Sequence, residues 1–558
     1  MPRLTLALLL LAACAPPATN EPTPPAGQTP GKTEQTTKPE ETVKPDETKP
    51  VATPAVDFFI VSADALKASA EKWRDYRIQQ GLRASYATVS QIAGDATNKT
   101  DVVDAIEKRI HEEATKDGAG KPFFVLLLGD ADDKKKVGTT LVPDGTYKDT
   151  SGSVSTDNYY ADLDEDDMPD LAIGRVAVTT NAEAEVVLSK TMSYESDYEA
   201  GEWNRKASVF ASEAGFSPQI DQTIENLVFD IVEDLPYDYD FTMTYGKQTS
   251  PYVFIPEQFS DKVYERMNEG AMLVTYVGHG STDAFTSLRW SGHSFDIFDT
   301  ADLAKLNVQH RSPILSFIAC LTGGFAKGES LSERIVKQAG APVAVLSSTE
   351  VSDPVPNAIF VRELGQAMLG EKKATLGEAF VRAKERMITQ KDALRTKIST
   401  LASLMYTPTA LAALETSHLH MYTLFGDPAL KIGRPTGTLT LTVPASVTKG
   451  TNLAVSATVS GLAAGDAVVT LEAKRSTLVG TPAAVPADGN ASRNAVITAN
   501  YALANNKRVV TQNVPHDGKT LGATLVVPAG TAAGDYVVKV YAKSGTTDAI
   551  TSKAIKVQ

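Results

Sequence analysis

The sequence predicts an α/β protein: a three-layer αβα sandwich in two subdomains, built around a mainly parallel sheet and followed by a β-sandwich. Two observations lead to this prediction. Apolar runs of strand length alternate with helical patterns from residue 57 to about residue 430. Continuously apolar strands separated by helices are typical of a parallel sheet that helices cover on both faces. Beyond about Pro435 the chain changes to alternating Thr and Val, with Gly and Pro between the runs.

The first 13 residues predict a lipoprotein signal peptide. Arg3 precedes the apolar run Leu4 to Leu11, and small residues lead to Cys14. This run is too short to span a bilayer as a mature helix. The residues Leu11-Ala12-Ala13-Cys14 resemble the bacterial lipobox, in which the cysteine is acylated and becomes the new N-terminus. An ordinary signal peptide with a chance cysteine is the alternative.

Acylation of Cys14 implies a membrane anchor, because several acyl chains hold a protein on a membrane far better than one does. We therefore expect an extracytoplasmic protein that is lipid-anchored to a bacterial membrane or cell surface. Of the bacterial membranes, we expect the outer membrane. Residues 14–54 predict a disordered tether, because they are rich in Pro, Thr, Glu and Lys and residues 15–54 contain no aromatic side chain.

Charge and cysteine content narrow the classes of function. The net charge of −14 argues against a nucleic-acid partner, because binding phosphates needs a basic face. The chain has two cysteines. If Cys14 is lipidated, Cys320 is the one thiol of the mature protein, and an intramolecular disulfide is excluded. An unpaired thiol in an oxidising compartment needs an explanation.

Residues 55–200 and 201–434 predict two α/β subdomains. Their apolar strand runs are Asp57 to Val61, Phe123 to Leu128, Ser208 to Ala211, Ala271 to Val277, Pro313 to Ala319 and Pro342 to Leu346. Polar residues follow several of these runs: Asp130, Glu213, His279 and Cys320. An open α/β sheet places its ligand-binding crevice at such carboxyl ends of strands.

Residues 435–558 predict an antiparallel β-sandwich. Leu439 to Val443 and Tyr536 to Tyr541 alternate in the manner of half-buried strands. About 120 residues is the size of an immunoglobulin-like domain, although the cysteine pair of antibody domains is missing.

A histidine and a cysteine follow two neighbouring strand runs. His279 lies between Gly278 and Gly280, and flanking glycines let the backbone approach a ligand closely. Cys320 comes 41 residues later, directly after a buried run and shortly before Gly323. This separation leaves room for one strand-helix unit that brings the two strand ends side by side. A thiol near an imidazole can ionise to the thiolate, which is the attacking species.

The order strand-His-Gly and then strand-Ala-Cys resembles the caspase, legumain and gingipain clan, and within it the gingipain family matches best. Four ordered motifs carry this resemblance: Tyr160-Ala161-Asp162-Leu163-Asp164 with Pro169-Asp170-Leu171-Ala172-Ile173-Gly174-Arg175, Tyr276-Val277-Gly278-His279-Gly280-Ser281, Ala319-Cys320-Leu321-Thr322-Gly323, and Leu424-Phe425-Gly426-Asp427-Pro428-Ala429-Leu430. The resemblance implies a caspase-like sheet, with residues 201–434 as the catalytic subdomain, and an immunoglobulin-like C-terminal domain.

The resemblance also implies roles for individual residues. Cys320 attacks the scissile carbonyl, His279 protonates the leaving amine, and the N–H groups of Gly280 and Cys320 bind the oxyanion. An acidic residue orients the histidine in gingipains, and Glu213 is the nearest match, although its register is uncertain by one residue and a solvated loop carboxylate is the alternative. Arginine-specific gingipains use an aspartate some residues after the orienting acid. Asp221 is the aspartate of the corresponding stretch here, but it stands out of register with that position, so a preference for basic substrate residues does not carry over.

An acidic run predicts a structural calcium ion, held by Asp162, Asp164, Asp166 and Asp170 at the first, third, fifth and ninth positions of an EF-hand-like loop. A solvated acidic turn is the alternative, because Asp167 and Ile173 replace the glycine and glutamate of that loop. His418 and His420, two positions apart as strand neighbours would be, are interpreted as structural, because no third ligand accompanies them.

These observations predict a lipid-anchored cysteine endopeptidase of the gingipain type that acts on proteins or peptides and needs no cofactor for its chemistry. A sortase-like transpeptidase is the alternative among enzymes, because an amine can resolve an acyl-enzyme as water does. A surface adhesion or scaffold protein on the same fold is the alternative from another class. It would be favoured by loss of Cys320 or His279, and both residues are present.

Overall fold

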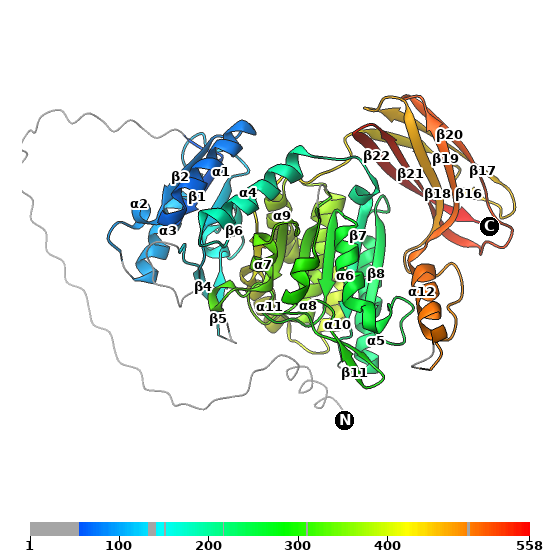
Figure 1. The fold of residues 1–558 in the computed structure, drawn as a ribbon, viewed down its shortest axis with the longest axis horizontal. Coiled ribbons are helices and arrows are strands. Elements are labelled where there is room, and N and C mark those ends of the chain that lie inside the picture. Colours follow the sequence, from blue (N-terminus) through cyan, green and yellow to red (C-terminus); the bar gives the residue numbers. More distant parts are fainter. Residues whose placement is uncertain are drawn as a thin grey trace, which may run out of the picture.

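The computed structural model describes residues 55–96, 98–131, 141–149, 152–215, 217–308, 311–487 and 491–558. The predicted signal peptide, Cys14 and the predicted tether therefore lie outside the described residues. Across the described ranges, no helix combines the length and the apolar character needed to cross a membrane. Figure 1 shows the α/β part of the chain and, at one end of it, the β-rich C-terminal part.

One continuous sheet of ten strands spans both predicted subdomains. Five neighbouring strands, from β2 to β14 in sheet order, run parallel to one another, and so do the other five, from β13 to β8. The two sets run in opposite directions, because β14 pairs antiparallel with β13. In sheet order the strands are β2 (Ala84–Thr88), β1 (Phe58–Ser62), β3 (Phe124–Leu128), β6 (Ala172–Val176), β14 (Tyr422–Phe425), β13 (Ala344–Ser348), β12 (Ile314–Ile318), β9 (Leu273–Val277), β7 (Lys206–Ser212) and β8 (Asp240–Gly246). The structure thus confirms the α/β class and the largely parallel sheet, but the two subdomains share that sheet.

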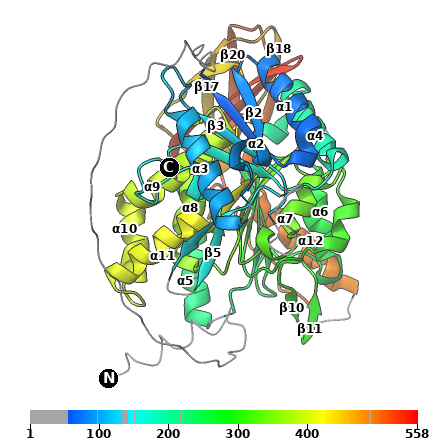
Figure 2. The same cartoon turned by 90° about the vertical axis from the view of Figure 1, so that its left-hand side faces the viewer.

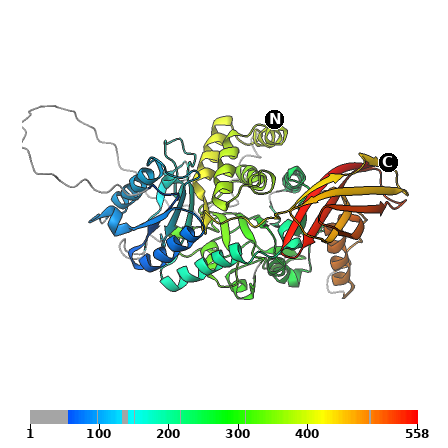
Figure 3. The same cartoon turned by 90° about the horizontal axis from the view of Figure 1, so that it is seen from above.

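Helices cover both faces of this sheet. They are α1 (Lys67–Gln79), α2 (Val89–Ala93), α3 (Lys99–Ala114), α4 (Asn181–Ser196), α5 (Pro218–Asp234), α6 (Phe259–Asn268), α7 (Leu331–Lys337), α8 (Pro354–Gly365), α9 (Leu376–Thr389), α10 (Ala393–Ala402) and α11 (Pro408–Met421). Figure 3 shows the yellow-green helices α8 to α11 on one side of the sheet and the teal helix α4 on the other. Capping side chains start several of them: Thr180 for α4, Ser330 for α7 and Asp353 for α8.

Strand β12 shows how the sheet sorts its side chains between the two layers. Leu315 and Phe317 belong to the core that contains residues of α6 and α7, whereas Ile314 and Ile318 belong to the core that contains residues of α8 and α9. This alternation follows from the two-residue period of a strand. Cys320, an even number of residues after Ile318, continues it and lies on the α8 side, where its sulfur contacts Ser352.

The two halves of the sheet meet where β6 and β14 pair through a single register contact, Arg175 with Phe425. A side chain on Gly174 would lie 2.5 Å from the Gly426 carbonyl oxygen, so the two chains approach closely here. The buried Arg175 guanidinium donates to both oxygens of Asp157, at 2.8 and 2.6 Å, and to the carbonyls of Gly129 and Val142. Arg175 of the first motif thus forms a buried ion pair, here called an ionic lock, at the joint where the two halves of the sheet meet.

The last motif forms a second lock at the same joint. The buried Asp427 carboxylate accepts hydrogen bonds from Trp73 Nε1 at 2.5 Å and from Arg77 Nε at 2.9 Å, both on α1. Arg77 also pairs with Glu195 of α4 at 2.9 Å. Both motifs therefore serve the connection between the halves of the sheet, since each ties a loop or helix of the N-terminal half to β6 or β14.

Residues after Pro435 form two sheets around one apolar core. One sheet contains β15 (Thr438–Thr442), β17 (Asn452–Ser460) and β20 (Thr520–Val526), and the other contains β16 (Ser446–Val447), β22 (Thr547–Val557), β21 (Gly534–Ser544), β18 (Gly465–Ala473) and β19 (Arg508–His516). Burial alternates residue by residue along β17, as the Thr/Val pattern predicts. The pairing is antiparallel except between β16 and β22.

The structure adds a helix that the sequence pattern did not indicate, α12 (Ala491–Asn505) between β18 and β19. Asn505 pairs with the edge strand β8, accepting from Met243 N–H at 2.7 Å and donating to the Met243 carbonyl at 3.0 Å. Tyr501 contacts the Thr244 hydroxyl at 2.7 Å. This helix therefore covers an edge that would otherwise expose unpaired backbone groups. The immunoglobulin-like relationship of the domain stays a prediction.

Two hairpins lie outside these sheets: β4 (Gly145–Lys148) with β5 (Ser153–Thr156), and β10 (Leu288–Trp290) with β11 (His293–Phe295). The β10–β11 hairpin follows the His279 loop and lies at the lower end of the molecule in Figures 1 and 2.

Candidate active site

The strand register brings the three predicted catalytic positions to one edge of the sheet. Val277 pairs with Ile318 of β12 on one side and with Ala211 of β7 on the other. His279, Cys320 and Glu213 each stand two residues beyond these partners. Neighbouring strands are about 4.8 Å apart, so the three backbones leave the sheet side by side.

Glycines allow the histidine loop to lie directly against the cysteine turn. A side chain on Gly280 would lie 3.0 Å from both Ala319 Cβ and the Cys320 carbonyl oxygen. A side chain on Gly278 would meet Ser212 Oγ at 2.0 Å. The two glycines of the motif are therefore required by close packing on both sides of His279.

The His279 imidazole is half-buried and its Nε2 lies 2.9 Å from the carbonyl oxygen of Ala214. A carbonyl only accepts, so Nε2 carries the hydrogen, and in the neutral ring Nδ1 is left with the lone pair that can take a proton. The backbone of this loop is held as well, because the buried Tyr276 hydroxyl contacts the His279 carbonyl at 2.8 Å and Ser212 Oγ at 3.1 Å.

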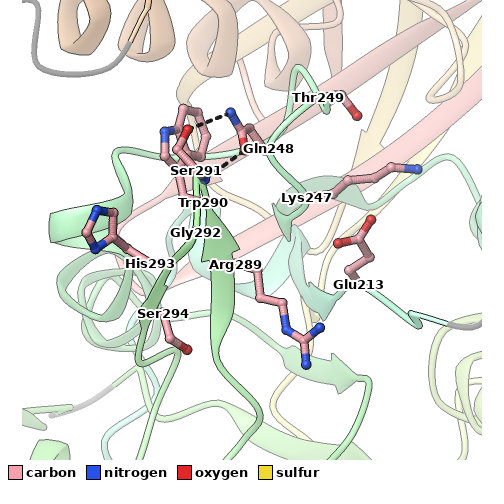
Figure 4. A pocket seen from close by; sticks show the side chains of 10 residues that line it. All are labelled: Glu213, Lys247, Gln248, Thr249, Arg289, Trp290, Ser291, Gly292, His293 and Ser294. Carbon is pink, nitrogen blue, oxygen red and sulfur yellow. Dashed lines mark hydrogen bonds between the residues drawn. The ribbon is translucent and has the colours of Figure 1, made fainter.

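Glu213 lies next to Ala214, and its side chain lines a cavity of about 580 Å³. The hydrogen bond recorded for the His279 ring goes to the Ala214 carbonyl and not to this carboxylate. Figure 4 shows Glu213 beside Lys247 and Arg289, below the turn between β10 and β11. Lys247 is already paired with Glu225 at 2.5 Å. The cavity is thus lined by charges of both signs.

Cys320 is 5% exposed and sits in a tight turn. The following residue, Leu321, has a φ of +61°, a conformation that costs a non-glycine residue about 1 kcal/mol or more. Backbone hydrogen bonds from Leu321 N to the Glu350 carbonyl and from Gly324 N to the Leu321 carbonyl hold the turn. Strain of this kind, kept by surrounding bonds, is typical of functional sites.

Behind the sulfur lies a set of buried polar groups that neither motif contains. Cys320 Sγ is 3.7 Å from the Ser352 carbonyl oxygen and 4.0 Å from Ser352 Oγ. Asn357 Nδ2 donates to Ser352 Oγ at 2.8 Å, and the Tyr422 hydroxyl donates to Asn357 Oδ1 at 2.7 Å. These residues come from the loop after β13, from α8 and from β14, and no local pattern in the sequence marks them.

The predicted oxyanion donors lie at the same place. Around Gly280, Ser281 N donates to Ala284 and Thr286 N donates to the His279 carbonyl. These two bonds flank Gly280 in its antiparallel contact with Phe285, so that contact does not use the Gly280 N–H group. The Gly280 N–H group therefore keeps the position that the oxyanion prediction requires, beside the Cys320 turn.

The predicted calcium ligands do not all come together. Ligand oxygens of Asp162, Asp164 and Asp166 lie within 4.8 Å of one another. Asp170 lies outside this group, and its Oδ2 accepts from Leu163 N at 2.8 Å. Repulsion from Asp166 raises the pKa of Asp164. The loop therefore offers three carboxylates, of which two are exposed.

His418 and His420 lie in the last turn of α11 and not in a strand. His418 Nδ1 contacts the Leu414 carbonyl at 2.7 Å, and its Nε2 accepts from Asp353 N at 2.8 Å. Burial lowers the pKa of His418 to about 4, so the ring is neutral and both nitrogens are used within the protein. His420 Nε2 contacts Asp167 at 2.9 Å and its ring stacks on Tyr147. These contacts agree with a structural role for both.

Comparison with known proteins supports the family resemblance. Gingipain R2 and gingipain R1 of Porphyromonas gingivalis are each 22% identical to the chain over 269 residues, which is 48% of this chain. The matched part spans only 32% of gingipain R2 and 24% of gingipain R1.

Two solved structures share the fold. The complex of the pro- and mature domains of Porphyromonas gingivalis RgpB gives a TM-score of 0.50 at 18% identity, covering 90% of this chain and 100% of that one. A structure described as a protease gives 0.50 at 16% identity, with 90% and 97% covered. The family profile of peptidase family C25 matches residues 52–433. The chain therefore belongs to peptidase family C25.

Proposed function

We propose that this chain is a cysteine endopeptidase that hydrolyses peptide bonds in proteins through Cys320 and His279. The observation that carries the proposal is the register of β7, β9 and β12, which brings the ends of the histidine and cysteine strands side by side. The contact of Gly280 with the Cys320 turn adds to it. A rigid sheet that presents a thiol and an imidazole at one edge is what nucleophilic catalysis requires.

The groups present can carry out both halves of the reaction. His279 Nδ1 takes the proton of the Cys320 thiol, and the thiolate attacks the scissile carbonyl carbon. The carbonyl oxygen becomes an oxyanion that the N–H groups of Gly280 and Cys320 stabilise, each contributing about 3 kcal/mol. His279 then gives its proton to the leaving amine. The C–N bond breaks and leaves an acyl group on the sulfur. Water then gives a proton to His279 and attacks the acyl carbon, the C–S bond breaks to release the carboxylic acid, and His279 returns the proton to the sulfur.

The third catalytic role is shared between two neighbours in this proposal. The Ala214 carbonyl holds the imidazole in its working tautomer. The Glu213 carboxylate, one residue away, stabilises the imidazolium through space. In a Ser-His-Asp triad one aspartate both orients the histidine and stabilises the imidazolium. Here the carbonyl would do the first and the carboxylate the second.

We also propose that acylation of Cys14 anchors the enzyme outside the cell on a bacterial membrane. Its support is the lipobox-like sequence at residues 11–14, which lies outside the described residues. Cys14→Ser should move the full chain from the membrane fraction to the soluble fraction, because the acyl chains are lost. If the variant stays with membranes after a high-salt wash, the anchor lies elsewhere.

A calcium ion at Asp162, Asp164 and Asp166 is proposed as a structural element of the loop before β6. Three carboxylates that face one another suit Ca²⁺, which prefers clustered oxygen ligands. Added Ca²⁺ should raise the melting temperature of the wild type relative to a chelator and have no effect in Asp164→Asn. An equal response in both proteins would mean that these carboxylates bind no calcium and form a solvated acidic turn.

The test of the peptidase proposal is hydrolysis of a denatured-protein peptide library by the full chain and by Cys320→Ala. We expect a loss of at least about 1,000-fold, because removing a covalent nucleophile costs orders of magnitude. The matched control is Cys14→Ser, which removes the other cysteine and should keep the activity. Retention of a tenth of the activity by Cys320→Ala would refute the proposal. Products joined to an added amine, in place of free acids, would identify a transpeptidase.

A further inference from the structure

We propose that Ser352, oriented by Asn357 and Tyr422, directs its hydroxyl hydrogen at Cys320 Sγ and thereby stabilises the thiolate. The inference rests on the proposed function, in which Cys320 is the nucleophile. It assigns Ser352 as a positioning residue on the side of the sulfur away from the His279 loop, and it makes Asn357 and Tyr422 the groups that fix its direction.

Counting donors and acceptors along the chain of groups limits where the Ser352 hydrogen can point. The Tyr422 hydroxyl donates to Asn357 Oδ1 at 2.7 Å, which fixes the amide with Nδ2 on the other side. Asn357 Nδ2 then donates to Ser352 Oγ at 2.8 Å. Ser352 Oγ receives this bond on a lone pair, so its own hydrogen must point elsewhere. Two acceptors lie within its reach: Cys320 Sγ at 4.0 Å, and the oxygen of the Tyr422 hydroxyl, whose own hydrogen is given to Asn357.

Burial makes this arrangement rigid. Tyr422 is 1% exposed and Ser352 and Asn357 are each 8% exposed. Tyr422 stacks on Phe360 with 4.0 Å between ring centroids, and Asp353, next to Ser352, caps α8 through Val355 N. Buried polar groups keep their hydrogen bonds because an unpaired group costs about 1–3 kcal/mol. Water therefore does not compete for the Ser352 hydroxyl.

The two contacts of Ser352 with the sulfur favour different protonation states. The Ser352 carbonyl, at 3.7 Å, can only accept and thus favours the neutral thiol. The hydroxyl donates and favours the thiolate, and a donor bond strengthens when its acceptor becomes charged. When Cys320 gives its proton to His279, the carbonyl contact is lost and the hydroxyl contact shortens. The hydroxyl thus offsets part of the cost of a buried negative charge.

Few other groups facing the sulfur can supply this stabilisation. His279 follows β9, and its proton uptake is the reaction itself. Tyr276 of β9 and Tyr422 of β14 are buried, and burial raises the pKa of both phenols, so they are neutral. Asp353 and His418 lie behind Ser352: the Asp353 carboxylate is bound by Tyr406, and His418 is neutral. Glu350 is the carboxylate of the same loop and opposes a thiolate.

The experiment measures the pH dependence of alkylation of Cys320 by iodoacetamide in the full chain carrying Cys14→Ser. Cys320 is then the only thiol in the protein. The thiolate sulfur displaces iodide, so the rate follows the thiolate fraction. Ser352→Ala should raise the midpoint by about one pH unit, which lowers the rate about tenfold on the acid side. Asn357→Asp should raise it at least as far, because a carboxylate attracts the Ser352 hydrogen away from the sulfur.

The matched control is Ser347→Ala. Ser347 is a fully buried serine of the neighbouring strand whose hydroxyl contacts Ser332 at 2.7 Å, so its loss should leave the midpoint unchanged. Melting temperatures of all variants show whether each one is folded. An unchanged midpoint in folded Ser352→Ala, or an equal shift in Ser347→Ala, would overturn the inference. The expected shift in a protein that hydrolyses no peptide would instead overturn the proposed function and leave the inference standing.

Discussion

The two halves of the ten-stranded sheet have the same topology but treat the carboxyl ends of their strands in different ways. In the N-terminal half, β3 and β6 end among buried charges, with Arg175 locked to Asp157. In the C-terminal half, β9 and β12 end in glycines and neutral hydroxyls around His279 and Cys320. One edge is filled by ion pairs, and the other holds the candidate dyad of His279 and Cys320.

This difference shows why motifs of one family need not all be catalytic. The hydrogen bonds of Arg175 are used inside the protein, since its guanidinium reaches one carboxylate and two carbonyls. Arg175 also lies over the ring of Phe325, with 4.9 Å from its guanidinium carbon to the ring centroid. Because Phe325 follows Gly323 and Gly324, the lock in one half supports the cysteine turn in the other.

The largest effect on stability is expected from breaking a lock. Arg175→Leu leaves Asp157 buried without its partner, and such a loss typically destabilises by about 3–5 kcal/mol. Thermal or urea unfolding of the variant measures this change. The matched control is Lys72→Met, whose pair with Glu185 is about half exposed and should contribute about 0–1 kcal/mol. Equal effects of the two substitutions would mean that the joint is not locked by charge.

Gly278→Ala tests the half of the sheet that carries His279 and Cys320. The added methyl would lie 2.0 Å from Ser212 Oγ and 2.7 Å from the Tyr276 hydroxyl, so the histidine loop must shift. Overpacking of this kind costs about 1–3 kcal/mol. Peptide hydrolysis should fall further than stability does, because His279 moves with the loop. Normal hydrolysis in a destabilised variant would show that the glycine serves packing alone.

Glu213→Gln tests charge apart from geometry. We expect turnover to fall by about tenfold, roughly 1.4 kcal/mol of transition-state stabilisation, with melting temperature unchanged. The Ala214 carbonyl keeps the imidazole in place, so substrate binding should persist. The comparison is Asp170→Asn, which should keep its turnover and act on stability only. A normal turnover in Glu213→Gln beside a collapse in folded Asp170→Asn would move the third role to Asp170.

The smallest effect at neutral pH is expected from His418→Gln. Burial lowers the pKa of His418 to about 4, whereas the unfolded chain takes up this proton near pH 6.5. The unfolded state therefore binds more protons between these values, and wild-type stability falls as the pH drops from about 6.5 to about 4. Glutamine removes this slope and can still accept from Asp353 N. Identical pH profiles of the melting temperature would contradict a buried neutral ring.

Much of the fold could be predicted because its signals are local. Each apolar run became a strand of the sheet, and the alternating run from Leu439 became the strand β15, which is half-buried. The run Tyr536 to Tyr541 also became a strand, β21, but it is buried on both faces. The continuity of the sheet could not be predicted, because β14 reaches β6 through contacts far apart in the sequence. Helix α12 was not predicted, because no local pattern in the sequence marks it. The roles of Asn505 and Tyr501 become visible only through their contacts with β8.

The candidate site shows the same division. His279 and Cys320 carry their motifs, and the register brings those positions together as the sequence suggested. The Ala214 carbonyl could not be found, because a backbone acceptor has no residue type. Ser352 and Asn357 could not be found either, since their role depends on a loop and a helix that fold behind the sulfur. Of the four predicted calcium ligands, Asp170 lies apart from the others, because its Oδ2 accepts a hydrogen bond from Leu163 N.

The most direct test of the account is capture of the acyl-enzyme on Cys320. The full chain is mixed with an activated peptide ester, quenched in acid within one turnover, digested and analysed by mass spectrometry. The account predicts the mass of the acyl group on the peptide that contains Cys320, at close to one equivalent per chain. It predicts no such adduct in Cys320→Ala and a strongly reduced one in His279→Ala. An adduct on another residue, or undiminished turnover without any adduct, would contradict the catalytic dyad.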